Sequence, residues 1–139
     1  MQKISIQHTS TLCIGTEYSD NYNHLNNIKA EELFEVGQTA LLAACGTSWR
    51  DIDQRFEVFC VVFEKHAVYR TQVLPGENVE IETHLEVGPV RFVFSQRMKR
   101  HDVVCIEYHI TRVLWSTRRR RTIALPEELR LQFHSCVAE

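Results

Sequence analysis

The chain has 139 residues, of which 44% are hydrophobic and three are prolines, and its formal net charge is −2. This size and composition predict a single domain over residues 1–139 with one core. The small net charge provides no general attraction for nucleic acid. No apolar run approaches the roughly 20 residues that cross a bilayer, and the first residues lack the apolar stretch of a signal peptide. We therefore expect a cytoplasmic protein with no membrane partner.

The spacing of cysteines and histidines argues against a disulfide framework and against a metal site. The five cysteines are far apart and form no CxxC pair, and the histidines other than His24 show no ligand spacing. Most of the cysteines are expected to be free core thiols, because free cysteine packs as a small hydrophobic residue. We expect neither a metal ion nor another cofactor.

In chain order, the first elements are a strand before Tyr18 and then one long helix. Apolar residues recur at helical spacing over residues 28–45. Asn26 or Asn27 can cap the start of this helix, and Gly46 is placed to end it. Many residues of the apolar stripe are small, so the helix can lie close to the surface that covers it.

After the helix, the hydrophobic period changes to two, which predicts consecutive antiparallel strands. The first of them, 56–73, is apolar on both faces from Val58 to Phe63 and is expected at the centre of the sheet. The later elements are a strand at 78–87, a turn at 88–89, a strand at 90–98, a turn at 100–102, a strand at 104–114 and a short helix at 126–134. This order predicts an α+β fold, in which a curved antiparallel β-sheet is wrapped around one long central helix.

The segment between the first strand and the helix carries the candidate chemistry. Residues 17–27 read EYSDNYNHLNN, which places Asp20 and His24 just ahead of the helix N-terminus. Unpaired backbone N–H groups and the helix dipole favour negative charge there, and this suits attack on a carbonyl. No GxSxG motif and no Ser-His-Asp order is present, so an α/β-hydrolase triad is not supported.

These residues resemble the signature of the 4-hydroxybenzoyl-CoA thioesterase-type hotdog proteins, D-x-x-G-H-V/L-N-N-x-x-Y-L-x-x-F-E-x-x-R. Aligned without a gap, Asp20 falls on the catalytic aspartate, His24 on the histidine, and Asn26 and Asn27 on the asparagine pair. The resemblance continues through 33–35 and reaches nearly the whole chain, with further matches at 75–77, 88–94 and 124–126. Three positions depart from the signature: Asn23 stands for glycine, Ala30 for tyrosine and Gln38 for arginine.

The resemblance implies a hotdog thioesterase that hydrolyses an acyl-CoA or acyl-carrier-protein thioester without a cofactor. Asp20 would act as nucleophile or as general base, and the Asn27 N–H would polarise the carbonyl oxygen. His24 would orient the loop or contact the thioester. Other residues assigned to substrate binding are Tyr22, Asn26, Arg118 and Arg120, the last two belonging to an arginine run at 118–121.

Each assignment has a structural alternative. Asp20 could be a turn or capping residue, His24 could form a structural hydrogen bond, and the arginine run could be a solvated strand end. For the whole protein, the alternatives are a hotdog dehydratase with His24 as base, which lacks the His-Phe-Pro-type motif, and a non-catalytic acyl-thioester-binding hotdog protein, motivated by Ala30 and Gln38. The family pairs subunits edge to edge, which implies a homodimer or homotetramer.

Overall fold

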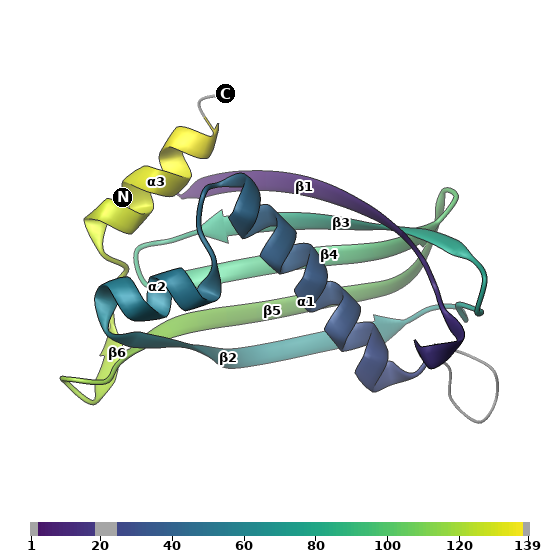
Figure 1. Ribbon diagram of the computed structural model, residues 1–139, viewed down its shortest axis with the longest axis horizontal. Coiled ribbons are helices and arrows are strands. Elements are labelled where there is room, and N and C mark those ends of the chain that lie inside the picture. Colours follow the sequence, from purple (N-terminus) through teal and green to yellow (C-terminus); the bar gives the residue numbers. More distant parts are fainter. Residues whose placement is uncertain (1–2, 19–24, 138–139) are drawn as a thin grey trace.

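The computed structural model describes residues 3–18 and 25–137, and Figure 1 shows its helices and strands. In chain order the elements are β1 (Ile4–Cys13), a short 3₁₀ turn (Thr16–Tyr18), α1 (Asn27–Ala44), α2 (Trp49–Phe56), β2 (Val58–Tyr69), β3 (Asn78–Val87), β4 (Arg91–Arg100), β5 (Val103–Ser116), β6 (Arg121–Ile123) and α3 (Glu127–Val137).

The strands form one antiparallel sheet in the order β1-β3-β4-β5-β2, and β6 pairs with β5. β3 occupies the predicted range, and its alternating side chains from Val79 to Val87 are buried on one face. The turns predicted at 88–89 and 100–102 separate β3 from β4 and β4 from β5. The predicted series of antiparallel strands is therefore confirmed.

Helix α1 lies across one face of this sheet, which curls around it (Figure 1). Its buried residues include Ala30, Leu33, Phe34 and Leu41, which belong to the apolar stripe predicted from the sequence. The helix approaches β3 and β4 closely at Gly37, where an added Cβ would lie 2.8 Å from Thr83 Oγ1. The predicted close approach of a small-residue helix to its covering surface is confirmed.

Strand β2 lies at an edge of the sheet, so its predicted central position was wrong. The apolar pattern on both faces misled the prediction, because only one face is covered. Val58 is 1% exposed, whereas Phe59 and Phe63 are 57% and 53% exposed. A bulge between Val62 and Glu64 also interrupts the register with β5. As an edge strand, β2 leaves backbone N–H and C=O groups with which another chain can pair.

Two helices flank the strands at one end of the molecule. The sequence analysis did not predict α2, which has eight residues and a single buried one, Ile52. Ser48 caps it by accepting a hydrogen bond from the Asp51 N–H at 3.0 Å, and Trp49, Ile52 and Phe56 recur at helical spacing, so the sequence did carry signals for this helix. The predicted C-terminal helix is confirmed as α3, which buries Leu129 and Phe133 completely.

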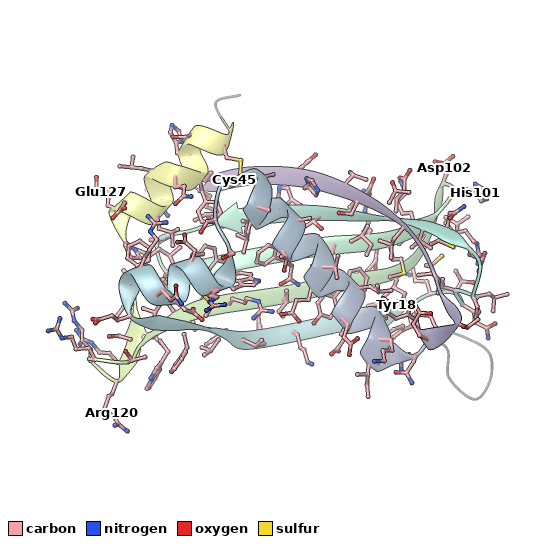
Figure 2. All side chains as sticks on the ribbon, in the orientation of Figure 1. Tyr18, Cys45, His101, Asp102, Arg120 and Glu127 are labelled. Atoms are coloured by element: carbon pink, nitrogen blue, oxygen red, sulfur yellow. A yellow bond between two sulfur atoms is a disulfide. The ribbon has the colours of Figure 1, made fainter. Side chains whose placement is uncertain are left out.

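Cys45 at the end of α1 and Cys136 in α3 form a disulfide, with Cα atoms 5.4 Å apart (Figure 2). The prediction of free thiols was wrong for this pair, because its partners are 91 residues apart in the chain and meet only through the packing of α3. Cys13, Cys60 and Cys105 are free, but only Cys105 is the buried core thiol that was predicted, since Cys60 is partly exposed and Cys13 is exposed. No helix among the described residues is long and apolar enough to span a membrane.

Candidate functional site

The start of α1 is the part of the predicted site that the structure describes. Asp20, Tyr22 and His24 lie outside the described residues. The residues on either side of the segment 19–24 are joined, because the Asn26 N–H donates to the Tyr18 carbonyl at 2.7 Å. Both ends of the segment that carries Asp20 and His24 are therefore held at the first turn of α1.

Asn26 is the N-cap of α1, as predicted. Its side-chain Oδ1 accepts hydrogen bonds from the N–H of Ile28 at 2.8 Å and of Lys29 at 3.4 Å. Asn27 is the first helical residue, and its own N–H has no hydrogen-bond partner within residues 3–18 and 25–137. Unpaired N–H groups at a helix start are donors available to a ligand, and the helix dipole adds to their attraction for negative charge.

A cavity of about 270 Å³ lies beside Asn27, between the start of α1 and the chain that leaves β2. Its polar lining includes Tyr69, Arg70 and Thr71. Arg70 donates to the Glu107 carboxylate at 2.7 Å, and this hydrogen bond lowers the pKa of Glu107. Burial, followed by the nearby charge of Glu31, raises the pKa of Tyr69, which keeps the phenol neutral as a hydrogen-bond donor.

The cavity residues were not predicted from the sequence. Nothing in the local sequence of 69–73 separates a cavity wall from an ordinary strand end. Their position follows from the antiparallel return of β2 along β5 and from one backbone contact, the Leu25 N–H bonded to the Val73 carbonyl at 2.8 Å.

A buried polar network lies under the middle of α1. Gln38 donates to Gln96 at 3.0 Å, and Gln96 in turn donates to Thr83 Oγ1 at 3.0 Å and to the Phe34 carbonyl at 2.8 Å. The Nε of Arg112, on β5, donates to Gln38 Oε1 at 3.3 Å. Position 38, where the family signature has an arginine, thus holds a glutamine that contacts an arginine of the sheet.

An aromatic pair lies beside this network, since Tyr108 is opposite Gln96 in the β4–β5 register and Gln96 bonds to the Phe34 carbonyl. The rings of Phe34 and Tyr108 stack with centroids 4.8 Å apart and an angle of 7° between their planes. Burial raises the pKa of Tyr108 to about 12, and the negative charge of Glu31 adds to this shift. Tyr108 therefore remains a neutral phenol at physiological pH.

The arginine run lies at the turn between β5 and β6: Arg118, Arg119 and Arg120 belong to this turn, residues 117–120, which we call the arginine turn, and Arg121 begins β6. The Arg120 N–H donates to the Ser116 carbonyl at 2.8 Å, and Arg120 adopts a left-handed backbone with φ 55°. All four arginines of the run are exposed, and none forms an ion pair with a described carboxylate. Figure 2 shows Arg120 and Tyr18 at opposite ends of the molecule. Within one subunit, Arg118 and Arg120 are not brought together with Asn26 and Asn27.

The described side chains provide no metal centre. In residues 3–18 and 25–137, no three histidine, cysteine, aspartate or glutamate side chains are grouped so that they could hold a metal ion. The described part of the candidate site at the start of α1 consists of the Asn27 N–H, the Asn26 side chain and the cavity beside Asn27.

The model of the thioesterase-like superfamily matches residues 14–133. The chain belongs to this superfamily. Membership confirms the predicted enzyme class, a thioesterase-type hydrolase, and together with the similar structures it confirms the predicted hotdog fold. Among curated proteins, none matches the chain in sequence.

Several solved structures share this fold at low sequence identity. A DHNA-CoA thioesterase from Staphylococcus aureus is 13% identical with a TM-score of 0.81, over 95% of this chain and 89% of that one. A 1,4-dihydroxy-2-naphthoyl-CoA thioesterase from Synechocystis is 9% identical with a TM-score of 0.82, over 91% and 95%. A hypothetical protein from Staphylococcus aureus, solved in complex with CoA, is 17% identical with a TM-score of 0.76, over 97% and 84%.

Proposed function

We propose that the protein hydrolyses an acyl-CoA thioester at the start of α1, with Asp20 as nucleophile or general base. The observation that carries the proposal is the Asn27 N–H at the first turn of α1, which has no hydrogen-bond partner among the described residues and lies next to the bonded ends of the segment that contains Asp20. The superfamily supplies the reaction class, and the cavity beside Asn27 supplies space for the reacting group.

The chemistry needs a nucleophile and a donor for the developing oxyanion. As nucleophile, the Asp20 carboxylate would attack the thioester carbon, release the CoA thiolate and form a mixed anhydride that water then hydrolyses. As general base, Asp20 would instead take a proton from the attacking water. In both routes the Asn27 N–H would donate to the oxyanion, a contact typically worth about 10² to 10³ in rate. His24 would orient the loop or contact the thioester, and Tyr22 and Asn26 would border the substrate.

The carrier in this proposal is CoA. Two of the similar structures are named as CoA thioesterases, and a third is in complex with CoA. These names support a CoA thioester for this chain, while the acyl group stays open. The proposal treats residues 1–139 as one hotdog domain that needs no cofactor.

The proposed active form is a homodimer, or a tetramer built from such dimers, in which two β2 strands pair edge to edge. In antiparallel pairing the two β2 strands run in opposite directions, so the Val58 end of one strand lies toward the Tyr69 end of the other. In one subunit, the end of β2 near Val58 lies beside the arginine turn, and the end near Tyr69 lies beside the start of α1. The reversal would bring Arg118 and Arg120 of one subunit toward the start of α1 in its partner, where they would meet the phosphates of CoA.

The test is release of free thiol from a panel of short, long and aromatic acyl-CoAs. We expect Asp20→Asn to lose this activity by several orders of magnitude while its circular dichroism stays that of the wild type. Asp102→Asn, at an exposed residue of the β4–β5 turn, is the matched control and should remain fully active. Unchanged turnover in Asp20→Asn would exclude Asp20, and saturable binding without thiol release would favour the non-catalytic alternative.

A further inference from the structure

The face of the sheet turned away from α1 carries an aromatic patch next to the arginine turn. Phe59, Phe63 and Trp115 are 57%, 53% and 40% exposed. Phe59 lies directly opposite Trp115 in the β2–β5 register, so their Cβ atoms are about 5 Å apart. Open faces of antiparallel sheets are usually polar, so a group of large aromatic residues on such a face indicates a binding surface.

Cationic side chains surround this patch. The arginine turn begins two residues after Trp115, and the Arg91 guanidinium lies 4.3 Å from the centre of the Phe63 ring. None of these arginines pairs with a carboxylate among the described residues, whereas Arg97, on the same face, pairs with Glu82 at 2.9 Å. The uncompensated charge beside the patch favours an anionic ligand over an apolar one.

The backbone holds the turn in a fixed position beside the patch. The Arg119 N–H donates to Ser116 Oγ at 3.0 Å, and the Thr117 N–H donates to the Glu57 carbonyl at 3.1 Å. These bonds tie the turn to the ends of β5 and β2, the strands that carry Trp115 and Phe59. The run has no aromatic residue between its arginines, and the fold supplies the missing aromatics from two neighbouring strands.

We propose that this surface binds a purine nucleotide, with the base stacked on Trp115 or Phe59 and the phosphates held by Arg118, Arg119 and Arg120. A flat base and a phosphate match the two kinds of group present, because aromatic rings stack on bases and guanidinium forks bind phosphate oxygens. We identify this nucleotide as the adenosine bisphosphate end of CoA, and this identification rests on the proposed function. Edge pairing of β2 would leave the patch open, because it uses backbone groups and not this face.

The first test is calorimetric titration with adenosine 3′,5′-bisphosphate, which contains no thioester and so reports binding apart from hydrolysis. We expect Trp115→Leu to weaken binding about tenfold, in line with the loss of one base–aromatic stack. Arg118→Gln/Arg119→Gln should also weaken binding and reduce its dependence on salt. Arg97→Gln removes an already paired charge from the same face and should bind as the wild type does.

The result that overturns the site is wild-type affinity in both Trp115→Leu and the double arginine variant, or no binding of the nucleotide at all. A single-stranded oligonucleotide that binds more tightly with increasing length would also overturn it, in favour of nucleic acid as the ligand. Asp20→Asn should bind the nucleotide normally. If Asp20→Asn hydrolyses thioesters at the wild-type rate while the patch variants lose nucleotide binding, the catalytic proposal fails and the nucleotide site stands.

Discussion

At Gly37, α1 comes close to the sheet. A Cβ at this position would lie 2.8 Å from Thr83 Oγ1 and 3.0 Å from both Gln96 Nε2 and Ile81 Cγ2. Two of these atoms belong to the buried network, and they are bonded to each other at 3.0 Å. A methyl group would therefore have to displace hydrogen-bonded atoms rather than a flexible side chain.

We expect Gly37→Ala to lower the melting temperature. Overpacking typically costs about 1–3 kcal/mol, which exceeds or offsets the roughly 1 kcal/mol that alanine gains over glycine in a helix. Thermal denaturation followed by circular dichroism measures the effect. Thr39→Ala, at an exposed position of the same helix, is the control and should change little. A raised melting temperature in Gly37→Ala would contradict the tight contact.

At the residue scale, the sequence predicted the capping by Asn26 but not the contacts of Gln38. Helix capping depends on nearby sequence only, because the Asn26 side chain accepts hydrogen bonds from the N–H groups two and three residues ahead. The contact of Gln38 with Arg112 joins residues 74 positions apart and depends on the strand register and on how the helix crosses the sheet. The sequence shows that Gln38 departs from the family signature, and only the fold shows that Arg112 contacts it.

At the scale of elements, α3 is fastened to the rest of the fold by more than packing. Gln132 Nε2 donates to the carbonyls of Cys45 and Gly46 at 3.1 Å, and Arg55 of α2 donates to Glu128 at 2.9 Å. The disulfide closes a loop of sequence separation 91 around these contacts. A link that closes so long a loop restricts the unfolded chain strongly, by on the order of 4 kcal/mol in the chain-entropy treatment.

We expect Cys136→Ser to melt at a lower temperature than the wild type in buffer without reductant, and the difference to shrink when dithiothreitol reduces both proteins. Cys13→Ser, at an exposed free cysteine, should behave as the wild type. Alkylation followed by mass spectrometry reports the state of the pair in protein taken from cells. A wild-type melting temperature that reductant leaves unchanged would show that the link contributes nothing.

Element prediction succeeded where one hydrophobic period extended over many residues and failed where it did not. β3 has a strict alternation over ten residues, and its ends were predicted correctly. α2 has eight residues, in which the helical spacing of Trp49, Ile52 and Phe56 extends over only two turns. β2 was assigned to the centre because an apolar outer face resembles a covered one in sequence, although here it is exposed at an edge.

At the scale of the whole molecule, the β2 edge determines the expected assembly. Val62 is 48% exposed at this edge, and we expect Val62→Lys to weaken self-association, because a charge on an edge strand opposes pairing with a second chain. Light scattering during size exclusion measures the mass. Leu131→Lys, at an exposed leucine of α3, is the control and should keep the wild-type mass. A fully active wild-type monomer would contradict the dimer.

Subunit mixing tests the same assembly through activity. If each site combines Asp20 of one subunit with the arginine turn of the other, inactive Asp20→Asn mixed with an arginine-turn variant forms heterodimers with one intact site. Activity with dilute acyl-CoA should then rise above that of either protein alone. Sites contained within single subunits would show no such gain.

Overall architecture and family were accessible from sequence because the strand order, the single long helix and the motif before it are all read along the chain. The walls of the site were not, since the cavity beside Asn27 is built from the far end of β2. Asp20, Tyr22 and His24 stay predictions, and their test is kinetic.

The hydrogen bond between Asn26 and Tyr18 has a consequence for engineering. It joins the residues on either side of the segment 19–24, so the ends of this segment stay together when its sequence is varied. Ser19, Asn21 and Asn23 have no role in the proposed reaction. Substitutions at these three positions can therefore be screened for acyl preference while Asp20, Tyr22 and His24, the helix, the sheet and the disulfide are kept.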